Sequence, residues 1–146
     1  MIYPIFLTLH LFAALIFVGT VFFEVLILEG VRKHVPVDVM RQIERAIGNR
    51  ARRLMPWVLL VLYGAGIGMA WQHRAALEHP LASSFGLLLT LKIVLALSVL
   101  AHFIAALVSM KRRTMTARRS HFIHRSIFWH MVFIVLLAKG MFYLHW

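Results

Sequence analysis

Cysteine is absent from the 146 residues of this chain. Disulfides, thiolate metal ligands, covalent haem attachment and cysteine nucleophiles are therefore excluded. Charge is also scarce, since 14% of the residues are Asp, Glu, Lys or Arg, against about 25% in a soluble domain. Only five residues are acidic. The sequence also has no phosphate-binding glycine loop, nucleophile elbow or HExxH motif, so it offers no support for a kinase or a hydrolase.

Apolar residues make up 62% of the chain, far more than a disordered or nucleic-acid-binding segment contains. We therefore expect no nucleic-acid partner. Four segments have the roughly 20 mostly apolar residues that a membrane-spanning helix needs: residues 3–28, 54–71, 85–110 and 123–146. The first lacks a basic start and a small-residue cleavage site, which argues against a cleaved signal peptide. The sequence predicts one all-α domain over residues 1–146, an integral membrane four-helix bundle.

The basic residues gather between the spans. Of the sixteen, seven lie in residues 31–56 and six in residues 111–126. In an up-and-down bundle these two loops share a side, which the positive-inside rule makes cytoplasmic. We therefore predict that both termini face outward, in a multi-pass protein of a bacterial-type inner membrane. The same loops are expected to contact anionic lipid headgroups.

The first basic loop is predicted to contain a helix of its own. Pro36 ends the preceding helix, and Asp38 is a suitable N-cap. Met40, Ile43 and Ile47 then recur at helical spacing, with arginines between them. This pattern predicts an amphipathic helix that lies at the cytoplasmic membrane interface.

Small residues in the second span predict a close helix contact. Gly64 and Gly68 form a small-xxx-small pair, with Ala65 and Gly66 beside them. Such pairs let two membrane helices approach closely.

Ionisable side chains inside spans are costly and mark candidate functional sites. Glu24 is the only acidic one. At about 1.5 Å of rise per residue, the others fall at two depths. An outer cluster contains His10, Lys92 and Lys139, and an inner pair contains His102 and His130.

Residues nine apart on a helix point to opposite faces at about 100° per residue. His130 and Lys139 have this spacing, so only one of them can face the centre of a bundle. Lys139 is near enough to the outer end to reach the interface. The opposed faces suggest a homodimer.

Neutral histidines on facing helices are the usual axial ligands of a non-covalently bound haem b. His10, His102 and His130 are the candidate iron ligands, and Lys92 and Lys139 are the candidate partners of the haem propionates. His and Met side chains also suit copper, and the chain has eight methionines. A histidine in a span can also be a structural residue that only forms hydrogen bonds.

Two stretches carry a family resemblance: LHLFAALIFVGTVFF, with His10 before Gly19, and FGLLLTLKIVLALSVLAHF, with Lys92 before His102. Together with Lys139 in the last span, they resemble the CopD-like superfamily of small membrane proteins, which includes the copper-resistance CopD domain and the HemJ-type protoporphyrinogen oxidases. The basic stretch RQIERAIGNRARRLMPW is similar to the segment before span two in the oxidases. The resemblance implies a four-helix membrane bundle with haem b bound by histidine at His10 and His102.

Three functions therefore remain open at the level of sequence. The first is a haem b membrane redox protein that transfers electrons or oxidises a quinone or porphyrinogen, which would make it a haem-dependent oxidoreductase. The second is a copper transport or copper-resistance protein. The third is a scaffold subunit without a cofactor.

Overall fold

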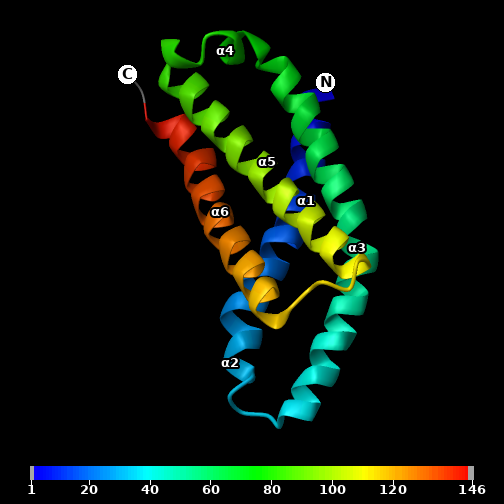
Figure 1. Cartoon of the computed structure of the whole chain (residues 1–146). Helices are drawn as coiled ribbons and strands as arrows, with labels where there is room; N and C mark the ends of the chain where they lie inside the picture. The colour runs from blue at the N-terminus through cyan, green and yellow to red at the C-terminus, as the bar shows by residue number, and fades with distance from the viewer. Residues whose placement is uncertain (1, 145–146) are drawn as a thin grey trace. The chain divides into compact units, whose positions relative to one another are not determined.

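The computed structural model describes residues 2–144, and within this range the secondary structure is helical, without strands. Four stretches are long and apolar enough to cross a membrane: Ile2–Val31, Val37–Gln72, Ser84–Lys111 and Arg118–Tyr143. The chain divides into two compact units, Met1–Gln72 and His73–Trp146. Each unit is a helical hairpin, and the two are described separately (Figure 1).

The first hairpin pairs the opening span with α3 (Val37–Gln72). The opening span is α1 (Ile2–Phe22), followed by a π-helical segment, η1 (Phe23–Leu28), and a last short turn, α2 (Glu29–Val31). The span thus begins and ends close to the predicted limits, 3 and 28. The π-helical segment includes Glu24. The hydropathy pattern did not predict a π-helix at this position. Segments of this kind are short and often occur at functional positions.

The predicted interfacial helix is present but is not a separate element. α3 runs through 36 residues, including Pro56, without a break. The residues that precede Pro56 are mainly Arg, Ala, Leu and Met, which favour helix strongly, so nothing before the proline ends the helix. Met40 on its apolar face is only 3% exposed. Met40 is therefore shielded by protein, Ile43 and Ile47 are half-buried, and the second span has a long basic extension.

The close contact between α1 and α3 falls on Gly68, one of the predicted pair, and on Gly66 in place of Gly64. A Cβ atom on Gly68 would lie 2.7 Å from the ring of Phe6, and one on Gly66 would lie 3.4 Å from the ring of His10. A Cβ atom on Gly64 would have no neighbour within 4 Å. Gly66 and Gly68, with the buried Ala65, therefore form the contact surface toward α1, and Gly64 is not part of it.

The second hairpin pairs α5 (Ser84–Lys111) with α6 (Ala117–Tyr143) (Figure 1). Two short helices precede it, α4 (Arg74–Glu78) and η2 (Pro80–Ala82). Ser83 caps α5 by accepting a hydrogen bond from the Gly86 amide. A Cβ atom on Gly86 would lie 2.8 Å from the carbonyl oxygen of Ala76. Only glycine therefore lets the α4 connection lie directly against the start of α5.

The turn between α5 and α6 has a Schellman geometry. The Arg113 amide donates to the Met110 carbonyl, and the Thr114 amide donates to the Ser109 carbonyl. This motif needs a left-handed residue after the helix, which is usually glycine. Here that residue is Arg113, with φ of 55°. An arginine in this conformation is less stable than a glycine by about 1 kcal/mol.

Large apolar side chains are exposed along all four long helices, among them Leu15, Trp57, Val94 and Leu136. A water-soluble protein rarely exposes contiguous apolar surface of this kind. The chain is therefore an all-α, multi-pass membrane protein.

Candidate functional site

A repeated sequence pattern places two serine–histidine pairs on the facing helices of the second hairpin. Ser98 precedes His102 by four residues on α5, and Ser126 precedes His130 by four residues on α6. Residues four apart lie on one helix face. Because α5 and α6 pack together, the two pairs meet, and the centroids of the two imidazoles are 5.3 Å apart.

Each histidine is held at Nδ1 by its own helix. His102 Nδ1 is 2.7 Å from the Ser98 carbonyl oxygen, and His130 Nδ1 is 2.7 Å from the Ser126 carbonyl oxygen. Since a carbonyl oxygen can only accept a hydrogen bond, both Nδ1 atoms carry the proton. In a neutral imidazole the lone pair is then on Nε2.

Each Nε2 atom faces the serine of the opposite helix. The Ser98 hydroxyl lies 3.0 Å from His130 Nε2, and the Ser126 hydroxyl lies 3.1 Å from His102 Nε2. With neutral histidines, both hydroxyls donate to these nitrogens. The four residues thus form a closed and reciprocal set of four hydrogen bonds, which we call the His–Ser ring. It satisfies all four imidazole nitrogens inside an apolar hairpin.

A groove of about 450 Å³ adjoins the His–Ser ring. Its volume lies within the range of cofactor and small-molecule sites. His130 and Ser126 contribute to the lining, and Arg125 adds a cation. The remaining lining residues are apolar or aromatic: Leu95, Phe122, Trp129 and Phe133. This combination suits a flat, largely apolar ligand that has an acidic group.

His10, in the first hairpin, has the same Nδ1 arrangement. Its Nδ1 atom lies 2.9 Å from the carbonyl oxygen of Leu62 on α3, so this nitrogen also carries the proton. Its ring lies against Gly66, which leaves room for it. All three histidines predicted as ligands therefore have Nδ1 fixed by a main-chain carbonyl.

The two lysines differ in exposure. Lys139 is exposed, whereas His130 is half-buried against α5, as the predicted opposition of their faces requires. Lys92 is half-buried. Within residues 2–144 neither lysine has a hydrogen-bond or ion-pair partner. Neither one lines the groove beside His130.

A site for a bare metal ion is not preformed in the described part of the chain, where no group of three or more His, Cys, Asp or Glu side chains is arranged to hold one. Haem iron needs fewer ligands from the protein, because the porphyrin supplies four nitrogens and the protein adds only the axial ligands.

Sequence reasoning missed Ser98, Ser126 and Arg125. The signal for the serines was available, because S-x-x-x-H occurs in both of the last two spans. Arg125 was interpreted only as a topology charge. Its place beside His130 follows from the start of α6 at Ala117, six residues earlier than the predicted start of the fourth span.

Geometry and composition thus define a multi-pass membrane protein with a half-buried pair of hydrogen-bonded histidines on two facing helices. No family model, curated protein or solved structure matches this chain.

Proposed function

We propose that this protein is a haem b-binding membrane redox protein of the CopD-like type. One observation carries the proposal: His102 and His130 are neighbours within membrane-spanning helices, and both have Nδ1 held by a main-chain carbonyl. Histidines that bind metals almost always have their second ring nitrogen anchored in this way, because the anchor fixes the ring and leaves Nε2 as the ligand atom.

The donor chemistry fits haem iron. His102 and His130 each offer an Nε2 lone pair, and a metal at either nitrogen replaces the hydrogen bond from the opposite serine. The groove beside His130 supplies aromatic walls from Phe122, Trp129 and Phe133. These aromatic walls suit the apolar face of a porphyrin.

The proposal assigns roles to the histidines and to Arg125. Nε2 of His102 or His130 binds the iron, and Arg125 pairs with a propionate. Lys92 and Lys139, which the sequence predicted as propionate partners, do not line the groove beside His130. His10 is a candidate ligand in the first hairpin. When bound, haem b supplies one-electron redox chemistry, which a quinone or porphyrinogen oxidation in the inner membrane would use.

The test is an absorption spectrum of the full-length protein, purified from haem-replete cells and recorded oxidised and then reduced. We expect a Soret band and a sharp band on reduction. The variants His102→Ala and His130→Ala should lose most of the bound haem, and His10→Ala shows whether the first hairpin has a ligand. His121→Ala is the matched control, because His121 is on α6 but is exposed and outside the groove.

Two results would contradict the proposal. One is a folded but colourless protein that gains no band when haem is added, as expected of a scaffold subunit. The other is stoichiometric copper without haem, lost in His102→Ala, which would identify a copper protein. Circular dichroism of each variant separates loss of haem from loss of fold.

A further inference from the structure

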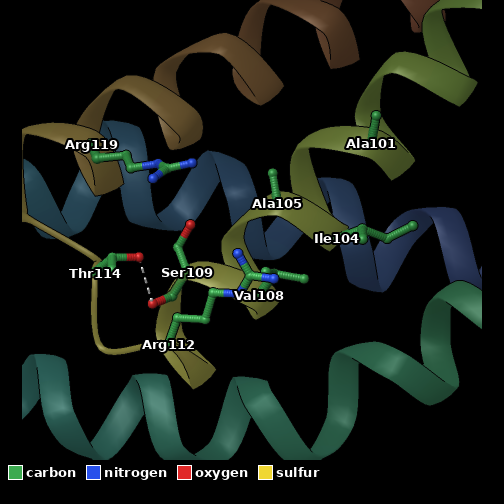
Figure 2. Close-up of a pocket in the computed structure, with 8 residues that line it drawn as sticks. All are labelled: Ala101, Ile104, Ala105, Val108, Ser109, Arg112, Thr114 and Arg119. Carbon is green, nitrogen blue, oxygen red and sulfur yellow. Dashed lines mark hydrogen bonds between the residues drawn. The ribbon is translucent and has the colours of Figure 1, made fainter.

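A second pocket, of about 480 Å³, lies where α5 ends and α6 begins. It belongs entirely to the second hairpin and shares no lining residue with the groove beside His130. Figure 2 shows its two parts, a polar end near the connecting turn and an apolar wall along α5. Its lining residues are Ala101, Ile104, Ala105, Val108, Ser109, Arg112, Thr114 and Arg119.

Two arginines enter the polar end from different elements. Arg112 follows the last residue of α5, and Arg119 is in the first turn of α6. In Figure 2 their guanidinium groups point from two sides toward the middle of the pocket, near Ser109. Within residues 2–144 neither arginine has an acidic partner, and the chain has only five acids in all. The pair therefore offers uncompensated positive charge to a ligand.

The backbone around both arginines is fixed by caps. The Arg112 amide donates to the Val108 carbonyl at 2.9 Å, within the Schellman turn. The Arg119 amide donates to the Thr116 hydroxyl at 3.2 Å, which caps α6. The spacing of the two arginine backbones is thus set by the fold, unlike that of charges on a free loop.

The apolar wall runs from the arginines toward the middle of the span. Ala101, Ile104, Ala105 and Val108 recur at helical spacing and form one stripe of α5. Ile104 is 51% exposed and Val108 is 42% exposed, so the wall is open to an occupant. A ligand that fits both parts has an anionic head and a long apolar tail.

We propose that this pocket binds one anionic phospholipid of the membrane leaflet on the basic side. Its phosphate lies between Arg112 and Arg119, and one acyl chain follows the stripe from Val108 to Ala101. Arginine pairs bind phosphate well because the planar guanidinium donates two parallel hydrogen bonds. A bilayer supplies this ligand at the depth where a span ends, and a free anion would leave the apolar stripe uncovered.

The experiment uses the full-length protein in nanodiscs of phosphatidylcholine with a minor fraction of phosphatidylglycerol. Native mass spectrometry of the released protein counts the retained phosphatidylglycerol. We expect one retained molecule, and about fivefold weaker retention in Arg112→Gln and in Arg119→Gln, since a basic residue at the membrane surface contributes about 1 kcal/mol. Arg118→Gln is the matched control, because Arg118 is exposed on the same turn of α6 but does not line the pocket.

Ile104→Ser tests the apolar wall without changing charge. It should weaken retention of phosphatidylglycerol and leave the fold intact, as measured by circular dichroism in phosphatidylcholine. An equal loss in Arg118→Gln would overturn the proposal in favour of diffuse surface charge. Retention of phosphatidylcholine at the same level would also overturn it, as would competition by inorganic phosphate as strong as that by the lipid. None of these readouts depends on haem.

Discussion

His130 Nε2 lies 3.0 Å from the Ser98 hydroxyl, and this contact is repeated with the helices exchanged, between His102 and Ser126. The two interhelical hydrogen bonds set how far α5 and α6 can slide past each other. A shift of one helical turn would separate both pairs and leave polar groups unpaired in an apolar hairpin. The His–Ser ring therefore specifies the register of the second hairpin, in addition to its proposed role as a ligand pair.

Replacing Ser98 by alanine should destabilise the second hairpin, because it removes the hydrogen bond between the Ser98 hydroxyl and His130 Nε2. We expect Ser98→Ala and His130→Ala to be coupled by about 0.6–1.7 kcal/mol, the size measured for interhelical hydrogen bonds in membranes. Reversible unfolding of the two single variants and the double variant in mixed micelles measures this coupling. Thr90→Ala is a suitable control on α5, because the Thr90 hydroxyl bonds only to the Gly86 carbonyl of its own helix. Additive losses in Ser98→Ala and His130→Ala would contradict the prediction.

Gly68→Ala should destabilise the first hairpin, because its new Cβ atom would lie 2.7 Å from the Phe6 ring. Overpacking of this kind costs about 1–3 kcal/mol. Adding Phe6→Leu to Gly68→Ala should restore part of the lost stability, since it removes the ring that the new Cβ atom meets. Gly64→Ala is the matched control and should be neutral or stabilising by up to about 1 kcal/mol, because alanine favours helix over glycine and the site is open. The same unfolding assay measures all three, and an equal loss in Gly64→Ala would show that this contact is wrong.

Gly86→Ala should be more damaging than Gly68→Ala. Its Cβ atom would meet backbone atoms, the Ala76 carbonyl oxygen at 2.8 Å and the Pro80 carbonyl oxygen at 3.1 Å. A backbone cannot rotate away as a side chain can, so we expect a loss near the upper end of the overpacking range, about 3 kcal/mol. Increased proteolysis in the segment around α4 should accompany the loss. Unchanged stability and unchanged cleavage would contradict the close approach at this position.

Arg113→Gly should stabilise the fold, although it removes a charge. The left-handed conformation of residue 113 favours glycine over arginine by about 1 kcal/mol. Arg113 does not line the proposed lipid pocket, so retention of phosphatidylglycerol should change little. Thermal unfolding in phosphatidylcholine measures the gain. The control Arg113→Lys retains the charge and the strain, and a gain in that variant equal to the gain in Arg113→Gly would refute the conformational explanation.

The positions of the four spans along the sequence were predictable, because they depend on local hydropathy. Apolar runs and loop charges are local signals, and a span must be long enough to cross the bilayer whatever it packs against. The predicted N-cap at Asp38 was wrong by a short distance, because α3 begins at Val37 and Asp38 lies in its first turn. The break predicted before residue 54 failed because Pro56 is tolerated in a membrane helix whose neighbours favour helix.

Packing partners were harder to predict. Gly64, Gly66 and Gly68 are equally small in the sequence, yet only the last two lie against α1. Which of them does so depends on the rotation of α3, and the hydrophobic pattern of a membrane helix sets that rotation weakly, since lipid and protein are both apolar.

The sequence by itself therefore determined the helical class and the four spans. Those properties follow from residue type and rise per residue, which need no knowledge of a neighbour. The tertiary structure decided that the two imidazoles meet, that Ser98 and Ser126 complete their hydrogen bonds, and that Arg112 and Arg119 share one pocket. These relationships depend on the relative rotation and register of α5 and α6, which arise only when the two helices pack.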